Sequence, residues 1–445
     1  MMHKLIRLIA VLALLAPLPA AAQDTGPVEV DVVGGQQAAQ PVAVPQFAAR
    51  GPASGPVGNI DTLSNNVAVV ISNQLRRTGI ITPIGPVGIR RLRNEEVTAP
   101  DFNDWRRSGA SALVTGYTEY TGDGRLTVAC YLFDAVTGRE LVRQGYAVAP
   151  SDWRRAATKC ADAIYSRLSG EEPFLDTRVV YVAETGGKAN RTKRIAIMDS
   201  DGENHRYLTE GLETVLTPRF SPTGRQLVYM SYKGRRPRSY VLDLDTGQSR
   251  LLVPGTAFTF APSYSPDGRQ IVFSMAEDGN TDIYVVGANG GTPRRLTTMQ
   301  GVDTAPSFSP DGRQIVFESD RSGSQQLYVM NADGSNQKRI SFGGGQYASP
   351  AWSPQGNRIA FTKIGGGQFR IGVMSPSGGG ERLLTSAWQD EGASWAPNGQ
   401  FVMFHRTDRG SGDATLYAVP VNGGRPRIMP TPLGGSDPSW SPLQN

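Results

Sequence analysis

The sequence predicts an α/β N-terminal domain followed by an all-β six-bladed β-propeller with a composite closing blade. An aromatic residue followed by Ser or Ala and then by Pro occurs six times in the C-terminal two thirds, and successive copies are 44, 44, 44, 43 and 45 residues apart. A fixed period of about 40–50 residues is typical of propellers with four-stranded blades. The front of the chain shows no such period. The repeated aromatic residues are Phe220, Tyr264, Phe308, Trp352, Trp395 and Trp440.

Residues 1–22 have the three parts of a secretory leader. Lys4 and Arg7 make its start basic, residues 8–15 form an apolar core, and the small residues 20–22 favour cleavage after Ala22. The apolar core is shorter than the ~20 residues that a membrane-spanning helix needs. We therefore expect an exported mature protein that begins at Gln23.

The mature chain is expected to start with a mobile strand and linker over residues 23–36. Residues 28–33 alternate between apolar and acidic side chains, as an exposed strand does, and residues 34–40 are rich in Gly, Gln and Ala. An edge strand of the next domain is the alternative interpretation of the same residues.

Residues 37–170 are expected to form the α/β domain. Apolar spacing predicts a helix over residues 60–77 that ends at Gly79, and a second helix over residues 152–168 with Ser151 as its cap. Another strand is expected over residues 41–47. Three further strands are expected over residues 112–116, 126–133 and 140–148.

Cys130 and Cys160 are the two cysteines of the chain, one on a predicted strand and one on a predicted helix of this domain. Export to an oxidising compartment favours a disulfide between them. Two separately buried thiols are the alternative, since spacing alone does not bring two Cα atoms within bonding range.

Residues 171–445 are expected to form the propeller. In the unit that begins at Tyr264, a Pro-Asp-Gly turn is followed by predicted strands over residues 270–273, 282–286 and 294–297. The sixth unit stops soon after Trp440, and matching strands for it occur over residues 178–182 and 193–198. We therefore expect the C-terminal strand to complete a blade that begins near Thr177, which would leave no open sheet edge at the junction.

Composition argues against nucleic-acid binding and against metal or nucleophilic catalysis. The leader holds two of the 45 Lys and Arg residues and none of the 40 Asp and Glu residues, so the mature balance is 43 against 40. The histidines are His3, His205 and His405, too few for a His/Cys metal cluster, and no GxSxG or Walker motif is present. Asp267 and Asp311 are interpreted as turn residues rather than calcium ligands. No cofactor is expected.

Two other functions are alternatives to a binding role. An exported propeller hydrolase would use inner-ring carboxylates, for which Asp303, Asp390 and Glu391 are the candidates. A glycan-binding lectin would need exposed tryptophans around the pore, whereas Trp352, Trp395 and Trp440 occupy the repeated core position. A non-enzymatic binding protein is the preferred interpretation.

The order of leader, α/β domain and six-bladed propeller resembles the TolB family over the whole chain. The serial aromatic-Ser/Ala-Pro-x-Gly units, the junction over residues 174–182 and the helix start at residues 152–157 carry the resemblance. It implies a periplasmic, monomeric hub of the Tol–Pal system that supports outer-membrane integrity and constriction during cell division. Contact with membranes would be through partners only.

The resemblance also implies two partner sites. TolA would bind the N-terminal segment, including Glu29, Val30, Asp31 and Val32. The lipoprotein Pal would bind the propeller mouth, in loops that enter the inner strands over residues 213–217, 258–261, 302–305, 347–349 and 389–391. The residues expected to contact Pal are Leu216, Thr217, Phe258, Thr259, Phe260, Asp303, Thr304, Asp390 and Glu391.

Overall fold

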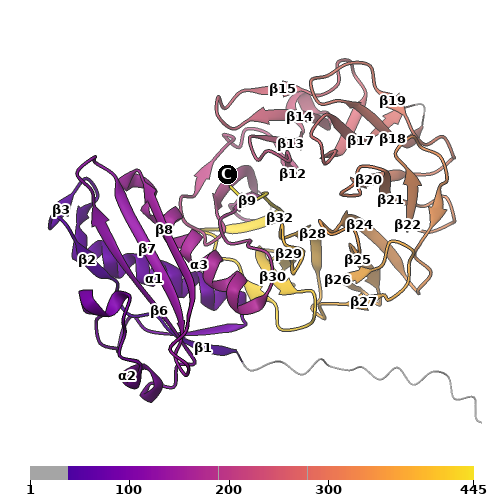
Figure 1. The fold of residues 1–445 in the computed structure, drawn as a ribbon. Coiled ribbons are helices and arrows are strands. Elements are labelled where there is room, and N and C mark those ends of the chain that lie inside the picture. The colour runs from indigo at the N-terminus through magenta and orange to yellow at the C-terminus, as the bar shows by residue number, and fades with distance from the viewer. Residues whose placement is uncertain (1–38, 189, 278, 445) are drawn as a thin grey trace, which may run out of the picture. The chain divides into compact units, whose positions relative to one another are not determined.

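An α/β domain is followed along the chain by a six-bladed propeller, which confirms the predicted fold class (Figure 1). The structure is a computed structural model that describes residues 39–188, 190–277 and 279–444. The predicted leader, its cleavage after Ala22 and the segment over residues 23–36 lie outside the described residues.

The α/β domain is built on a mixed sheet with the strand order β5-β1-β6-β7-β8, and β2 also pairs with β6. β1 runs parallel to β5 and β6, whereas β6, β7 and β8 form an antiparallel meander. The short strands β3 and β4 form a separate hairpin. The strands are β1 (Gln40–Ala43), β2 (Ala48–Arg50), β3 (Ser54–Gly55), β4 (Gly58–Asn59), β5 (Ile81–Ile84), β6 (Ala112–Tyr120), β7 (Leu126–Asp134) and β8 (Glu140–Val148).

Two long helices, α1 (Ile60–Thr78) and α3 (Trp153–Ser169), share one apolar core with this sheet. Asn59 caps α1 by accepting hydrogen bonds from the amides of Asp61 and Thr62, and Gly79 ends the helix in a left-handed conformation with φ of 78°. Both ends lie close to the predicted ones. Shorter helical segments are η1 (Asn94–Val97), α2 (Phe102–Arg107), η2 (Pro150–Asp152) and, in the propeller, η3 (Lys233–Arg235).

The predicted cap of α3 was wrong. Ser151 lies inside the 3-10 turn η2, and Asp152 is the residue before the helix. Pro150 starts this turn, so Asp152 has a ψ of 14° rather than the extended conformation that lets a side chain reach back to the helix amides. The Ser151 hydroxyl donates instead to the Asp152 carboxylate over 3.3 Å.

A disulfide joins Cys130 on β7 to Cys160 on α3, with Cα atoms 6.1 Å apart. Both residues are fully buried in the core between sheet and helix. The bond therefore ties α3 to the middle of the sheet.

Each propeller blade is a four-stranded antiparallel sheet, and its innermost strand lies around the centre of the ring (Figure 1). Blade 1 contains β32, β9, β10 and β11, and blades 2 to 6 follow in chain order from β12 to β31. The inner strands are β32 (Gly434–Trp440), β12 (Val215–Phe220), β16 (Phe258–Tyr264), β20 (Asp303–Phe308), β24 (Gln346–Trp352) and β28 (Asp390–Trp395). The second strands are β9 (Arg178–Thr185), β13 (Gln226–Ser231), β17 (Gln270–Glu277), β21 (Gln314–Ser319), β25 (Ile359–Gly365) and β29 (Phe401–Thr407).

The third and fourth strands complete each blade toward its rim. The third strands are β10 (Thr192–Asp199), β14 (Arg238–Asp243), β18 (Asn280–Gly287), β22 (Gln326–Asn331), β26 (Gln368–Met374) and β30 (Ala414–Pro420). The outer strands are β11 (Arg206–Tyr207), β15 (Ser249–Leu251), β19 (Arg294–Arg295), β23 (Lys338–Arg339), β27 (Arg382–Leu383) and β31 (Arg427–Ile428).

Blade 1 is the predicted composite of sequence-distant segments. β32, from the end of the chain, pairs antiparallel with β9 between Gly434↔Glu184 and Trp440↔Val179. Beyond the strand, the Ser441 amide donates to the Arg178 carbonyl over 2.9 Å. The propeller is thereby closed by β-sheet hydrogen bonds.

The repeated aromatic residue ends each inner strand and packs between blades. Separate apolar clusters occupy the junctions of blades 1–2, 2–3, 3–4, 4–5 and 5–6. At the junction of blades 6 and 1, Trp440 and Phe401 instead belong to a cluster that continues into the α/β domain. The core position predicted for Trp352, Trp395 and Trp440 is confirmed, with each of these side chains buried.

The disulfide should stabilise the α/β domain. We expect the double variant Cys130→Ala/Cys160→Ala to lose roughly 2–4 kcal/mol of unfolding free energy in urea titrations, because a closed loop of this length restricts the unfolded chain. Adding a reductant should lower the stability of the parent protein and leave the double variant unchanged. Equal stability of parent and variant under oxidising conditions would contradict this expectation.

Candidate functional site

All six inner strands begin at the same face of the propeller, which we call the mouth. It is formed by the first residues of β12, β16, β20, β24, β28 and β32 and by the loops that precede them. The expected loops over residues 213–217, 258–261, 302–305, 347–349 and 389–391 are largely the starts of these strands rather than loops. A bulge just inside each strand explains the difference, since it lets irregular residues remain paired with the second strand.

The bulge is repeated in every blade. Strand register shifts after the first residues of each inner strand, and the residue at the shift has a positive φ. Left-handed backbone costs a non-glycine residue on the order of 1 kcal/mol or more and is often found at functional sites. A proline follows this residue in five of the six blades. The bulge residues and their φ values are Thr217 (49°), Ala261 (48°), Ala305 (51°), Ser349 (50°), Gly392 (72°) and Asp437 (48°).

The predicted mouth residues of blades 2 and 3 differ in exposure. Leu216 and Thr217 are half-buried on β12. On β16, Phe258 is 43% exposed and Phe260 is half-buried, but Thr259 is buried. The Thr259 hydroxyl accepts a hydrogen bond of 2.7 Å from the amide of Ser239 in the preceding blade. Phe258 is therefore available to a partner, whereas Thr259 joins two blades.

The predicted acidic residues Asp303 and Asp390 are completely buried. Asp303 pairs with Arg321 over 2.5 Å, and Asp390 accepts two hydrogen bonds from Arg406 over 2.7 and 2.9 Å. Burial raises the pKa of Asp303, although Ser319 and the arginine oppose the shift. These carboxylates anchor the starts of β20 and β28. They do not line the mouth as the sequence suggested, because arginines from the second strand or the turn after it cover them.

Thr304 and Glu391, the remaining predicted residues, are half-buried. The Thr304 hydroxyl accepts a hydrogen bond of 3.1 Å from Ser274 in the preceding blade, and Glu391 accepts one of 2.7 Å from Gln389. Two of the three carboxylates proposed for a hydrolase, Asp303 and Asp390, are therefore held in buried ion pairs, and Glu391 is the one that is not.

Sequence reasoning missed most of an apolar ring at the mouth. Every blade carries at least one exposed large apolar side chain within the four residues that precede its inner strand or at the strand's first residue. Phe342 is 72% exposed and Trp388 is 37% exposed, so the lectin argument overlooked one exposed tryptophan. The only signal in the sequence is an apolar residue six to ten positions before each repeated aromatic residue. The mouth ring consists of Leu212, Phe258, Met299, Val302, Phe342, Trp388 and Leu433.

Arginines lie against several members of the mouth ring. The guanidinium of Arg339 lies 5.2 Å from the ring centre of Phe342, and that of Arg409 lies 5.8 Å from a Trp388 ring centre. Cations at such distances from aromatic faces are attracted to the ring electrons. The mouth thus presents apolar rings beside positive charge.

Side chains of one blade bind the bulge backbone of the next. The Thr217 amide donates to Asp437 over 3.1 Å, and the Ser349 amide donates to Glu318 over 2.5 Å. Glu318 is only 6% exposed, and burial raises its pKa to about 7 despite the hydrogen bond from Ser349. Its charge state therefore changes near neutral pH at the junction of blades 4 and 5.

Metal-binding chemistry has no support in the described part of the chain. Within it, no group of three or more His, Cys, Asp and Glu residues is placed to hold a metal ion. Asp267 accepts hydrogen bonds from Ser265 and from the Arg269 amide, and Asp311 is bound in the corresponding way. Both aspartates are thus turn residues, as predicted.

The second predicted site cannot be placed in the fold, because Glu29, Val30, Asp31 and Val32 lie outside the described residues. Among the helices that the structure describes, none has the length and apolar character needed to cross a membrane.

Comparison with known families covers almost the whole chain. Residues 165–444 match the family model described as TolB beta propeller domain, and residues 28–141 match the model described as TolB amino-terminal domain. The Tol-Pal system protein TolB of Rhizorhabdus wittichii is 62% identical over 96% of either chain. The protein of the same name from Paramagnetospirillum magneticum is 56% identical over 97% of this chain and 96% of its own.

A solved structure agrees in fold. The crystal structure of TolB from Acinetobacter baumannii superposes with a TM-score of 0.79 at 26% identity, and covers 91% of this chain and 97% of its own. The likeness includes the α/β domain as well as the propeller, since the propeller alone is a smaller share of the chain.

The buried Glu318 predicts a pH dependence of stability. Its pKa is raised in the folded state from 4.5 to about 7, so the contribution of this residue is complete below pH ~4.5 and is lost as pH rises to ~7. We expect the parent to lose on the order of 3 kcal/mol from this source between these pH values, and Glu318→Gln to lose that component. Urea titrations at pH 5 and pH 8 measure the difference.

The matched control is Glu210→Gln, which changes an exposed glutamate on the loop before β12. It should retain the pH dependence of the parent. A Glu318→Gln variant with the parent's pH dependence would show that Glu318 is ionised throughout.

Proposed function

Because the chain belongs to the TolB family and so has a role in the Tol–Pal system, we propose that it is a non-enzymatic binding hub of that system. In this proposal the mouth of the propeller binds Pal, the peptidoglycan-associated lipoprotein, and the segment over residues 23–36 binds TolA. The hub acts in the periplasm and supports outer-membrane integrity and constriction during cell division.

The mouth ring is the observation that carries the Pal proposal. It gathers exposed apolar side chains from all six blades at one face. Exposed apolar side chains on a shared surface are typical of protein interaction sites, and aromatic anchors often dominate binding energy. Phe258, Phe342 and Trp388 are the aromatic members. They are the residues we expect to contribute most.

The backbone beneath the ring supports the same role. The bulges are held by hydrogen bonds between blades and the strand starts by buried ion pairs, so the mouth is ordered before a partner arrives. A preorganised surface loses less conformational entropy on binding. The arginines beside Phe342 and Trp388 further favour a partner that offers carboxylates around an apolar centre.

The TolA proposal rests on sequence and family. The alternating residues 28–33 fit an extended segment that adds to the edge of a partner's sheet, and the linker after them would let the segment detach. Glu29, Val30, Asp31 and Val32 are proposed to make these contacts.

Pal binding can be tested with the purified mature protein and the soluble domain of Pal from the same organism. We expect saturable one-to-one binding in calorimetric titrations, and we expect Phe258→Ala and Trp388→Ala each to weaken it by about tenfold or more. The reason is the loss of an exposed aromatic anchor at the mouth. The matched control is Val136→Ala, which removes an exposed apolar side chain from a turn of the α/β domain. Absence of binding by the folded parent, or equal loss in the control, would refute the assignment to the mouth.

The TolA contact is tested by a variant that begins at Gln37. We expect this variant to lose binding to the periplasmic part of TolA and to keep its affinity for Pal, because the mouth is formed by other residues. Pull-down and calorimetry with both partners measure the two affinities. Retained TolA binding would place that site elsewhere on the protein.

A further inference from the structure

Each blade carries a cation at the same place on its outer strand. In every blade this residue pairs with the third strand, successive copies are 44, 44, 44, 44 and 45 residues apart, and the residue is Lys or Arg in all six. The six residues are Arg206, Arg250, Arg294, Lys338, Arg382 and Arg427.

At three junctions inside the ring this cation joins its blade to the next. The guanidinium donates to a backbone carbonyl in the turn between the third and outer strands of the following blade. We call this contact the clasp. The donor and acceptor pairs are Arg250 with Ala288, Arg294 with Asp333, and Arg382 with Val421.

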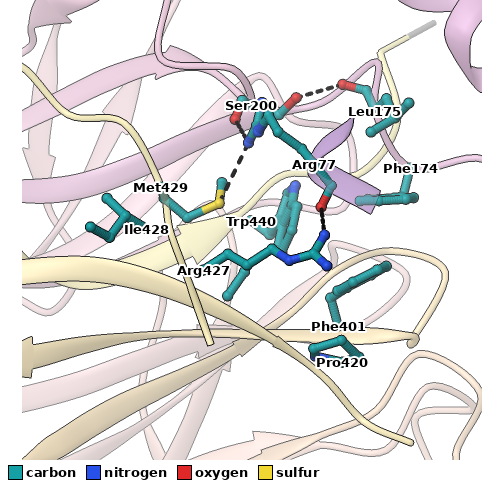
Figure 2. A pocket seen from close by; sticks show the side chains of 11 residues that line it. Arg77, Phe174, Leu175, Ser200, Phe401, Pro420, Arg427, Ile428, Met429 and Trp440 are labelled. Carbon is teal, nitrogen blue, oxygen red and sulfur yellow. Dashed lines mark hydrogen bonds between the residues drawn. The ribbon is translucent and has the colours of Figure 1, made fainter. Parts of the chain in front are cut away.

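At the junction of blades 6 and 1 the clasp takes a different route (Figure 2). Arg427 of blade 6 donates to the carbonyl of Arg77, in the last turn of α1, over 3.0 Å. It also donates to the carbonyl of Arg76 over 3.3 Å. Arg77 in turn donates to the Ser200 carbonyl of blade 1. The helix end therefore lies between the donor of one blade and the acceptor of the other.

Ser200 occupies the acceptor position that Ala288 and Val421 occupy in blades 3 and 6. Its amide donates to the carbonyl of Thr177, just before the second strand of its blade, as the amides of Ala288 and Val421 donate to the carbonyls of Arg269 and Gln400 just before theirs. The Arg77 side chain thus fills the place at which an outer-strand cation of the preceding blade would bind.

The end of α1 suits this role for two reasons. The last carbonyls of a helix lack partners within the helix and carry partial negative charge, so a guanidinium is favoured there. Gly79 follows the helix with φ of 78°, and a Cβ at this position would overlap the Arg427 guanidinium. A glycine is therefore required both by the backbone and by the clasp.

The apolar core also connects the α/β domain to the junction of blades 6 and 1. The cluster at the junction of blades 6 and 1 is continuous with the core of the α/β domain, whereas those of the other five junctions contain propeller residues only, as far as the described chain extends. Phe174 lies in the linker between the domains, and its ring centre is 4.9 Å from that of Phe401 and 5.9 Å from that of Trp440. A cavity of about 40 Å³ lies among these residues and the two arginines (Figure 2).

We propose that the last turn of α1 stabilises the propeller by bridging blades 6 and 1. This is the junction at which the ring is closed by strands from distant parts of the sequence. The α/β domain and the ring closure then open and close as a unit. Local unfolding of the last turn of α1 should therefore weaken the strand pairing in blade 1. Opening of the junction between blades 6 and 1 should in turn free the last turn of α1. This coupling is separate from partner binding and does not depend on the proposed function.

The test is hydrogen exchange of the purified mature protein, with Arg427→Ala compared with Arg250→Ala. Both variants remove one clasp arginine. We expect Arg427→Ala to speed exchange about 2- to 10-fold in the last turn of α1, in β10 and β11 and in β30 and β31, because each lost hydrogen bond favours local opening by this factor. Arg250→Ala should affect blades 2 and 3 only. Unchanged exchange in α1 for Arg427→Ala, or equal loosening of α1 by both variants, would overturn the proposal.

A second comparison uses the helix caps. Gly79 and Gly170 end α1 and α3 with nearly the same φ, 78° and 75°, but a Cβ at Gly170 meets nothing within 4 Å. Gly79→Ala should therefore loosen blade 1 beyond the effect of Gly170→Ala, which reports backbone strain alone. Adding Arg427→Ala should loosen blade 1 further in the Gly170→Ala background and little in the Gly79→Ala background. Equal effects in the two backgrounds would show that the helix end is not part of the clasp.

Discussion

The antiparallel pairing of β32 with β9 holds the propeller closed, and the rest of the molecule is arranged around it. Without this pairing, β9 would have an unpaired edge open to other chains, and the ring would lack one of its six inner strands. With it, six inner strands begin at one face and form a single mouth. The same junction receives the linker residue Phe174 and the last turn of α1. Closure of the ring and attachment of the α/β domain therefore share one set of residues.

The mouth combines a strained backbone with strong local support. Left-handed residues recur at the bulge of each inner strand, and side chains from preceding blades bind several of them. The buried ion pairs of Asp303 and Asp390 fix the local structure of the mouth. A buried ion pair gives little net stability, because desolvation offsets the attraction, yet breaking one is costly. Such pairs fix where β20 and β28 start, and the apolar side chains around them are displayed in a defined arrangement.

The sequence predicts the fold well and the site only in part, for physical reasons. The blade period and the apolar spacing of α1 express local patterns that recur along the chain, and the cap at Gly79 follows from its conformational freedom. By contrast, the partners that bury Asp303 and Asp390 lie 18 and 16 residues away and are set by strand register. Ser151 failed as a cap because Pro150 starts a tighter turn. The mouth ring has neither a fixed offset from the repeated aromatic residue nor a shared residue type, so no motif marks it.

A ring completed by its last strand also constrains how the protein is made. Chains are synthesised from the N-terminus, so β9 keeps an unpaired edge until residues 434–440 have been made. During that interval the α/β domain and blades 2 to 6 can form, but the circle cannot. Chaperones that shield exposed strand edges would therefore act on β9, and any change to β32 would affect the last step of assembly.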